Sequence, residues 1–351
     1  MDTVRIHLIE SIIICVFLLL IVSTYMLNVT SSYSANLYGT GHRMLDFDIK
    51  AVSPSKINVD EMLATSRNET LRKRCGSRFY NGTINSNTWD RFPPRIKPRL
   101  HFSDEHKLIA CTIPKSGSTS WIKALLMADG IVNVSTPNEI EQEDAYKLGM
   151  KHRYLWLHFN HTSKHGKAEI NRRLNDYYRI IIVREPLERV VSAYLDKVVH
   201  GKNIYAKLAH SLHKGTDGIT TFEEFVDSII SRPSFTYDIH WNLYESICDP
   251  CRLQYHYIVK LETMSQDVKY VSKMTGIDSH LLISEKTTER VSSLEHKWKI
   301  KYRKYLEDLP IEKVKKLYKI YSKDYELFGY PVPSYILPPK NNSKSVRGGR
   351  L

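Results

Sequence analysis

The sequence predicts an α/β fold in which helices cover a central parallel β-sheet. Three short apolar segments have the length and composition of buried strands: residues 107–113, 179–183 and 255–259. Amphipathic helical patterns follow the first two closely, at 119–127 and from Pro186 onward. Strands that alternate with helices in this way are typical of a parallel sheet that is covered on both faces.

Local signals mark the individual helices. Pro186 stands at the first-turn position that proline favours, at the start of PLERVVSAYLDKVV. Thr221 and Glu224 form a capping box before the apolar FVDSII. Residues 169–175 also have a helical pattern. Pro310 opens an amphipathic helix with a predicted apolar face of Ile311, Val314, Leu317, Tyr318 and Tyr321.

The composition is that of a globular protein with a basic surface. Hydrophobic residues make up 42% of the 351 residues, which supports a substantial core, and the formal net charge is +13. A basic surface suits anionic partners such as nucleic acid, acidic lipid, polyphosphate or acidic polysaccharide. Charge alone does not distinguish among these partners.

The N-terminal residues predict a secretory address. Residues 11–29 are uncharged and rich in Ile, Leu and Val, which favours a transmembrane signal anchor after a cytosolic tail of residues 1–10. The alternatives are a signal peptide cleaved near Ser34–Ala35 and a buried N-terminal helix. The anchor and the signal peptide both place the following residues in the secretory lumen. There we expect a stem at 30–74, a folded domain at 75–338 and a basic disordered tail at 339–351.

Glycosylation sequons support this lumenal address and argue against a nucleic-acid partner. Sequons of the form N-x-[ST] begin at Asn68, Asn81, Asn133, Asn160 and Asn341. Another begins at Asn28, which is too close to the predicted membrane segment for use. Single sequons arise by chance, so the argument rests on their number.

Four cysteines outside the apolar N-terminal segment are candidates for disulfides: Cys75, Cys111, Cys248 and Cys251. An oxidising lumen favours disulfides, and four cysteines allow three full pairings. The C-x-x-C at 248–251 also admits a zinc site or a redox motif. No second pair has zinc-finger spacing, and the surrounding segment does not resemble a strand that feeds a helix. A structural disulfide is therefore favoured.

The segment TIPKSGSTSW at 112–121 is the strongest functional signal. At a strand-to-helix turn, backbone N–H groups and the helix N-terminus form a cradle for a phosphate-like anion. The candidate binding residues are Pro114, Lys115, Ser116, Gly117, Ser118, Thr119, Ser120 and Trp121. The spacing is not G-x-x-x-x-G-K-[ST], which argues against a P-loop kinase. The alternative is an ordinary turn with Ser or Thr capping.

A second candidate anion site lies in IIIVREPLERVVSAY. Arg184 leaves the carboxyl end of a predicted strand, and Ser192 lies two turns into the next helix. Ligands of open α/β sheets bind at this edge, where an arginine can hold a phosphate through two hydrogen bonds. Alternatively, Arg184 pairs with Glu185 or Glu188. Together the two sites suit a nucleotide with phosphates on both its 5′ and 3′ sides.

At these two sites the sequence resembles the sulfotransferases that use 3′-phosphoadenosine 5′-phosphosulfate (PAPS). TIPKSGSTSW is similar to their 5′-phosphosulfate loop, and VREPLERVVSAY is similar to their 3′-phosphate element. Across residues 75–330 the chain resembles the Golgi carbohydrate sulfotransferases of the HNK-1 and chondroitin/dermatan 4-O type. The further matching segments are LRKRC (71–75), FEEF (222–225), His240-Trp241, CDPC (248–251), KLET (260–263) and YSKDYELFGY (321–330).

The resemblance implies a P-loop-like sulfotransferase fold, a type II Golgi membrane topology, and PAPS as donor with 3′-phosphoadenosine 5′-phosphate (PAP) as product. It implies in-line transfer of a sulfuryl group to a sugar hydroxyl of a glycosaminoglycan or glycoprotein glycan, with a chondroitin- or dermatan-like acceptor favoured. The family usually has PKVACTNWK where this chain has PKSGSTSWIK, so the loop indicates the donor better than the acceptor. The alternatives are a heparan-type O-sulfotransferase and an inactive, membrane-tethered glycan-binding protein of the same fold.

Four residues are candidates for catalysis. Lys115 is suited to stabilising charge on the bridging or leaving oxygen. A general base must accept the hydroxyl proton, and the candidates are His158, His161 and His240. His240 belongs to the matching His-Trp segment, whereas the other two precede the 179–183 strand, where heparan-type relatives place a histidine. Each histidine also fits a structural or surface role. No carboxylate cluster stands beside the loop, so no metal is expected.

Overall fold

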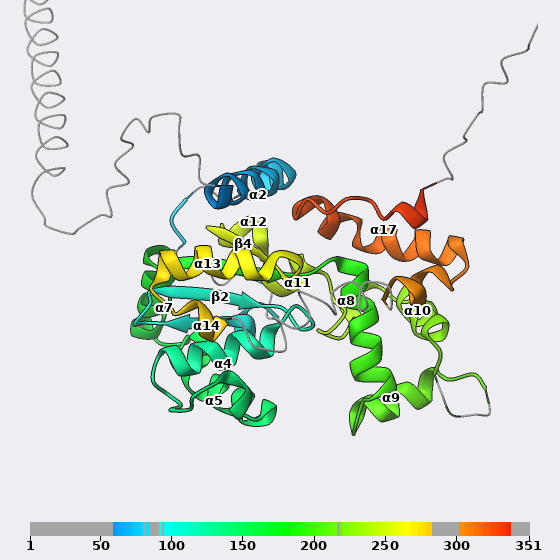
Figure 1. The fold of residues 1–351 in the computed structure, drawn as a ribbon, viewed down its shortest axis with the longest axis horizontal. Helices are drawn as coiled ribbons and strands as arrows, with labels where there is room; N and C mark the ends of the chain where they lie inside the picture. Colours follow the sequence, from blue (N-terminus) through cyan, green and yellow to red (C-terminus); the bar gives the residue numbers. More distant parts are fainter. Residues whose placement is uncertain are drawn as a thin grey trace, which may run out of the picture. The chain divides into compact units, whose positions relative to one another are not determined.

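The computed structural model describes residues 59–79, 82–84, 91–92, 95–215, 218, 220–282 and 302–337. A four-stranded sheet in the order β1-β2-β3-β4 lies among the helices of this part (Figure 1). Its strands are β1 (Leu100–Ser103), β2 (Leu108–Thr112), β3 (Tyr178–Val183) and β4 (Tyr257–Lys260). Strands β2, β3 and β4 run parallel, as predicted, while β1 pairs antiparallel with β2. The sequence does not predict β1, because the alternation of apolar and polar residues in Leu-His-Phe-Ser is too short to distinguish a strand.

Helices alternate with the parallel strands, as expected for an α/β fold. Helix α4 (Ser118–Ala128) follows β2, α7 (Lys164–Asp176) precedes β3 and α8 (Pro186–Ala193) follows β3. The helix predicted from Pro186 changes form after Ala193, where the chain continues as the π-helical turn η4 (Tyr194–Val199). Further α-helices in the described part of the chain include α2 (Val59–Cys75), α5 (Gln142–His152), α6 (Leu155–His158), α9 (Ile204–Leu212), α10 (Phe222–Ile230), α11 (Tyr244–Cys248), α12 (Pro250–Leu253), α13 (Met264–Thr275), α14 (Ser279–Leu282) and α17 (Ile311–Leu327).

The sheet is covered on both faces, which explains the apolar run in β3. Ile181 and Val183 pack in one core with residues of α7 and α11. Ile180 and Ile182 pack in a second core with residues of α4 and α13. Because side chains of a strand alternate between faces, a strand between two helical layers must be apolar at successive positions. The prediction of a helix-flanked α/β sheet is therefore confirmed.

A third core lies to one side of the sheet, among α8, η4, α10 and α17 (Figure 1). The capping box of α10 is present: Thr221 Oγ1 accepts from the Glu224 N–H at 3.2 Å, and Glu224 Oε2 accepts from the Thr221 N–H at 2.8 Å. In α17, Val314, Leu317 and Tyr321 are buried, as predicted. Ile311 instead is 46% exposed, because it is the first residue of the helix and lies beyond the core.

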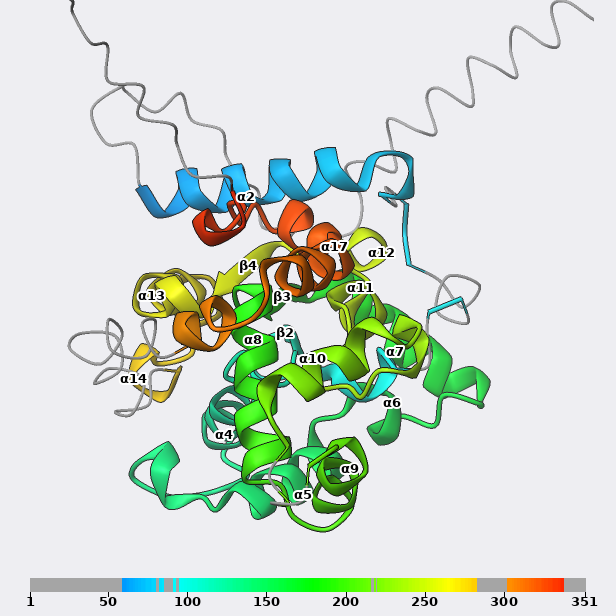
Figure 2. The ribbon, with the colours of Figure 1, turned by 90° about the vertical axis from the view of Figure 1, so that its right-hand side faces the viewer.

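Helix α2 packs against the domain, although residues 59–74 belong to the segment predicted as stem. It lies beside β4, α12 and α17 (Figure 2). Leu71 is buried, and the Arg67 guanidinium donates to Asp267 Oδ2 at 2.8 Å and to the carbonyl of Ile258 at 2.7 Å. The packed domain therefore includes α2 and does not begin at Cys75. The sequence hides this contact because hydrogen bonds, more than an apolar stripe, attach the helix.

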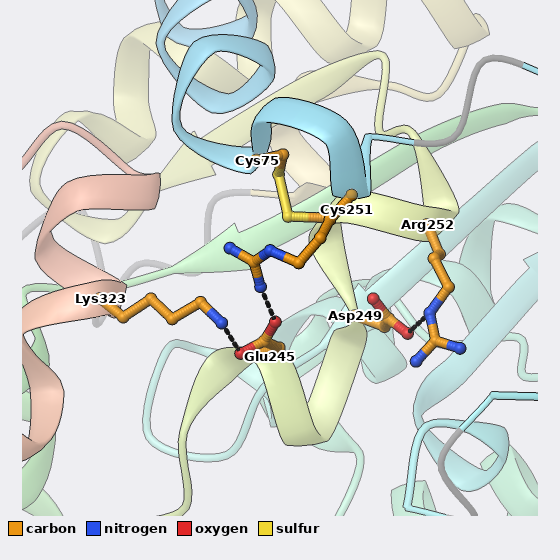
Figure 3. The surroundings of a disulfide bond; sticks show 7 residues. Cys75, Glu245, Asp249, Cys251, Arg252 and Lys323 are labelled. Atoms are coloured by element: carbon orange, nitrogen blue, oxygen red, sulfur yellow. Dashed lines mark hydrogen bonds and ion pairs between the residues drawn. A yellow bond between two sulfur atoms is a disulfide. The ribbon is translucent and has the colours of Figure 1, made fainter.

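Two disulfides connect distant segments to α11 and α12. Cys111 of β2 pairs with Cys248, and Cys75 of α2 pairs with Cys251. Figure 3 shows the second bridge at the end of α2, near Glu245, which forms an ion pair with Lys323. One of the three possible pairings is thus realised. The zinc and redox interpretations of the C-x-x-C do not hold, because its two sulfurs belong to separate bridges.

We expect the double variant Cys111→Ser/Cys248→Ser to unfold more readily than the parent. The bridge closes a loop with a sequence separation of 137 residues, and removing a bridge of this kind costs about 2–5 kcal/mol of unfolding free energy. Urea unfolding followed by circular dichroism measures the difference. Equal unfolding midpoints with equal slopes would contradict the prediction.

Several predicted features lie outside the described residues: the anchor at 11–29, most of the stem, the tail at 339–351, and the sequons at Asn81 and Asn341. Among the helices that the structure does describe, none combines the length and apolar character that crossing a membrane requires.

Candidate functional site

Three parallel strands end at one edge of the sheet, and the predicted anion-binding segments follow them. The loop after β2 leads into α4, and Arg184 follows β3 directly. A Cβ atom at Gly117 would lie 3.6 Å from Leu261 Cδ1, so the loop also contacts the segment after β4. Binding sites of parallel α/β sheets form at this edge.

The loop after β2 has an unusual backbone. Lys115 has a φ of +71° and Gly117 has a φ of +88°, in a region that glycine adopts readily and other residues avoid. Between them, the Ser116 N–H donates to the carbonyl of Ile113 at 3.2 Å and closes a tight turn. A lysine in this conformation is strained, and such strain concentrates at ligand sites.

The loop side chains fall into two groups. Ser116 is fully buried, its hydroxyl has no partner, and Ser118 is 6% exposed, whereas Lys115 and Ser120 are partly exposed. Thr119 Oγ1 is 3.0 Å from the hydroxyl of Tyr146 on α5. The Trp121 side chain is 1% exposed and packs in the apolar core, and its Nε1 makes no hydrogen bond within the described residues. Its contact with a ligand stays a prediction. Pro114 is also buried.

Two lysines and one aspartate meet at the loop. Lys115 Nζ lies 3.1 Å from Asp196 Oδ2, and Lys197 Nζ lies 3.2 Å from the same oxygen. Asp196 and Lys197 belong to η4, and π-helical turns inside α-helices are frequent at functional sites. Burial opposes the ionisation of Asp196, but the two ammonium groups outweigh it and lower its pKa. Two cations, one from the loop and one from η4, are therefore held by one carboxylate.

His240 lies beside this cluster. Its Nδ1 is 2.6 Å from Asp238 Oδ1 and 3.2 Å from the Tyr205 hydroxyl, which also donates to Asp238 Oδ2 at 3.1 Å. Burial lowers the pKa of His240, the Asp238 carboxylate opposes this, and the charges of Lys197 and Lys115 lower it further. The structure thus brings the predicted residues Lys115 and His240 together.

Arg184 lies at the end of β3 with its side chain 9% exposed. Its Nη2 donates to Glu188 Oε2 at 3.3 Å, and its guanidinium lies 4.5 Å from the centre of the Tyr302 ring. Its Nε is buried without a partner. The expected ion pair with Glu188 is therefore present, Tyr302 also hydrogen-bonds to the guanidinium, and Nε is left without a partner among the described residues. Ser192 is partly exposed on α8, and its hydroxyl bonds to no residue in the described ranges.

Tyr244 and Asp324 hold the Arg184 backbone in place. The Arg184 N–H donates to the Tyr244 hydroxyl at 3.2 Å, and the hydroxyl donates back to the Arg184 carbonyl. The Tyr244 N–H donates to Asp324 Oδ1 and Oδ2 at 3.2 and 3.1 Å. Asp324 belongs to the YSKDYELFGY segment, so this segment supports the site without lining it.

The other two candidate histidines lie elsewhere. The ring of His158 packs 5.2 Å from that of Phe102, which pairs with Ile109 near the start of β2. This is the opposite edge of the sheet from Lys115. His161 packs on Trp156, with ring centroids 4.5 Å apart. Neither histidine joins the Lys115 cluster, because α6 and the turn after it return the chain to the other edge.

Sequence reasoning misses four residues of the cluster: Asp196, Lys197, Tyr205 and Asp238. Asp238 has a usable signal, since it stands two residues before His240. Asp196 and Lys197 look like solvent-facing positions of a regular helix, and only the π-helical turn directs them to the loop. Tyr205 has no local signal, because the fold of α9 alone brings it to His240.

Comparison with known proteins agrees with this geometry. The chain matches the sulfotransferase family over residues 98–331. This chain belongs to the sulfotransferase family. Carbohydrate sulfotransferase 10 of Homo sapiens is 30% identical to it over 264 residues, 69% of each chain. Carbohydrate sulfotransferase 11 of Rattus norvegicus is 27% identical over 266 residues, 69% of this chain and 70% of the relative. No solved structure was found to match the chain.

These relatives confirm the resemblance seen in the motifs: the chain is a sulfotransferase enzyme related to carbohydrate sulfotransferases. Within the residues that the structure describes, this sulfotransferase has no group of three or more His, Cys, Asp or Glu that could hold a metal. Independence from metals stays a prediction.

The described sequons of this sulfotransferase differ in how accessible their asparagines are to glycosylation. Asn133 and Asn160 are exposed, and Asn160 Oδ1 accepts from the N–H and hydroxyl of Thr162, at 3.1 and 2.7 Å. Asn68 lies within α2, and its Nδ2 donates to the carbonyl of His256 at 2.6 Å. A glycan on Asn68 would break that contact, so the structure favours Asn133 and Asn160 over Asn68 as modification sites.

Proposed function

We propose that this sulfotransferase uses PAPS to sulfate a hydroxyl group of a glycan. The observation that carries the proposal is the meeting of Lys115, Lys197 and His240 beside two buried polar groups without partners, Ser116 Oγ and Arg184 Nε. Buried polar groups without partners are costly. Their presence at two neighbouring strand ends fits a ligand that brings acceptor oxygens to both.

The donor-binding residues follow from this arrangement. The loop Lys115–Ser120 would hold the 5′-phosphosulfate, and Arg184 with Ser192 would hold the 3′-phosphate. PAPS supplies the sulfuryl group when it is bound. Lys115 and Lys197 place two positive charges beside the loop, where they stabilise negative charge that develops during transfer.

His240 is the base that we propose for the acceptor hydroxyl. When Nδ1–H donates to Asp238 Oδ1, Nε2 keeps a free electron pair. The lowered pKa keeps the ring neutral near neutral pH. Nε2 can then take the hydroxyl proton, and the Asp238 carboxylate stabilises the imidazolium that forms. Tyr205 fixes the pair through its bonds to both side chains.

Our proposals for the acceptor and for the cellular location of the protein rest on less detailed observations. The relatives are carbohydrate sulfotransferases, and the formal charge of +13 suits an acidic polymer. We favour a chondroitin- or dermatan-like acceptor, on a glycosaminoglycan or a glycoprotein, over a heparan-type one. The apolar residues 11–29 and the sequons support a type II anchor in the Golgi membrane.

Arg184→Ala tests the donor site. We expect the Kd for PAP to rise about 10- to 100-fold, since hydrogen bonds to charged groups are worth about 1.5–3 kcal/mol. Isothermal titration calorimetry measures the change. The matched control is Arg172→Ala, which removes the same charge from an exposed side chain paired with Glu169. If PAP binds Arg184→Ala as tightly as the parent, the 3′-phosphate assignment fails.

The reaction itself is tested with labelled PAPS and a panel of desulfated chondroitin, dermatan, heparan and neutral N-glycans, followed by mapping of the product disaccharides. Sulfation of chondroitin or dermatan supports the favoured acceptor. If no glycan gains sulfate while PAP binds, the protein is the glycan-binding alternative.

A further inference from the structure

Arg99 lies at the carboxyl ends of the parallel strands, where the donor-binding loop begins. In the antiparallel ladder of β1 and β2, Leu100 pairs with Cys111, so Arg99 is level with Thr112, the last residue of β2. The loop starts at the next residue. Because β1 is the edge strand, Arg99 flanks the loop on the side away from β3 and Arg184. The two predicted phosphate sites therefore leave this flank unassigned.

The charge of Arg99 is uncompensated. Its Nε is buried without a hydrogen-bond partner, and no carboxylate in the described ranges forms an ion pair with it. Neighbouring arginines have partners: Arg95 donates to the carbonyls of Tyr237 and Phe235 at 2.6 and 2.8 Å, and Arg153, whose Nε also lacks a hydrogen bond, forms an ion pair with Asp129 at 2.7 Å. A buried donor of a charged group is costly without a partner, so the fold keeps it at a place where a ligand can supply one.

A second polar atom without a partner lies close to Arg99. His101 is fully buried, and its Nε2 makes no hydrogen bond. Its Nδ1 lies 3.2 Å from the Arg99 carbonyl and 3.0 Å from Thr112 Oγ1. Burial, aided by the charge of Arg99, lowers the pKa of His101 to about 3. His101 is therefore neutral, and Arg99 supplies the positive charge at this place.

Arg99 is also close to the proposed base. Its charge acts on Tyr205, whose hydroxyl is 3.2 Å from His240 Nδ1. Arg95, four residues earlier, attaches the same segment to the backbone just before Asp238. The charge of Arg99 therefore acts on the surroundings of the proposed base.

We propose that Arg99 binds an anionic group of the glycan acceptor, a carboxylate or a sulfate ester on a sugar next to the one that is sulfated. The inference rests on the proposed function. A guanidinium matches the planar pair of oxygens of a carboxylate and binds sulfate oxygens in the same manner. Arg99 would thus select chains that are already acidic before transfer.

The test compares Arg99→Gln with the parent on three polymers: desulfated chondroitin, carboxyl-reduced chondroitin that keeps its sulfates, and carboxyl-reduced desulfated chondroitin. We expect kcat/KM to fall about 10- to 100-fold, mainly through KM, on whichever acidic polymer carries the recognised group. On the neutral polymer the change should stay below threefold. Loss on the first polymer alone identifies the carboxylate, and loss on the second alone identifies the sulfate. Arg99→Lys should recover part of the loss.

The matched control is Lys273→Gln, which removes one charge from a lysine on α13 with a 62% exposed side chain. Its kcat/KM should equal that of the parent on all three polymers. Equal losses for Arg99→Gln on the acidic and neutral polymers, or no loss on any, would overturn the proposal.

If neither protein transfers sulfate, the proposed function fails and binding still tests Arg99. Calorimetric titration with a chondroitin hexasaccharide in the presence of PAP should then show weaker binding by Arg99→Gln. Equal affinities would overturn the role of Arg99 independently of the reaction.

Discussion

Lys115→Ala is expected to lower kcat by about 10³-fold, the effect of removing one well-placed group that stabilises transition-state charge. Lys115 is suited to this role because the turn fixes its backbone at a φ of +71° and Asp196 holds its ammonium group at 3.1 Å. A side chain that is already positioned loses little on reaching the transition state. Single-turnover assays with labelled PAPS and the best glycan acceptor measure the rate.

Lys147→Ala is the control for the loss of a lysine. Lys147 lies on α5 with a 69% exposed side chain, 3.8 Å from Asp144, and its replacement should leave kcat unchanged. PAP binding should weaken far less than kcat falls in Lys115→Ala, since the other loop donors remain. A rate within tenfold of the parent would show that Lys115 does not stabilise the transition state.

His240→Ala is expected to lower kcat by about 10²- to 10⁴-fold, which is the usual contribution of a general base. The pH profile gives a sharper result. Burial first, with Lys197 and Lys115, lowers the pKa of His240 below its ordinary value of 6.5. A base works only when unprotonated, so kcat/KM should level off at a lower pH than an ordinary histidine would give and fall as the pH drops through that lowered pKa.

Asp238→Asn should move this acid limb to still lower pH. The Asp238 carboxylate raises the pKa of His240, so its removal lowers that pKa further. The plateau should also fall, because the imidazolium loses its partner. His158→Ala is the control, since His158 lies at the other edge of the sheet, and it should keep the parent profile. An unchanged acid limb in Asp238→Asn would exclude His240 as the base.

The sequence predicts the parts of the fold that local pattern determines. The run at 179–183 is apolar at successive positions because both faces of β3 are covered, and Pro186 marks the start of α8. Strand β1 is not predicted because its four residues are too few for their alternating pattern to be distinctive. The packing of α2 against the domain is not predicted, because Arg67 attaches the helix through hydrogen bonds to residues nearly two hundred positions away.

The residues of the site likewise divide into those that local pattern predicts and those that it does not. Lys115 and Arg184 are predictable because each follows an apolar strand that ends at the binding edge. Asp196, Tyr205 and Arg99 reach that edge only through tertiary structure: a π-helical turn, the path of α9 and the register of β1. Trp121 is predicted from the motif alone; its ring packs in the core while its Nε1 makes no hydrogen bond within the described residues, so its contact with the donor stays a prediction.

The nested disulfides set an order for biosynthesis. The Cys75–Cys251 bridge encloses the Cys111–Cys248 bridge, so both early cysteines leave the ribosome long before their partners. Until Cys248 emerges, Cys75 and Cys111 have only each other among the described cysteines, and a bond between them would be incorrect. Correct oxidation must wait for the second half of the chain or pass through thiol–disulfide exchange. A chain that ends before Cys251 cannot form both native bridges, however complete its donor-binding motif is.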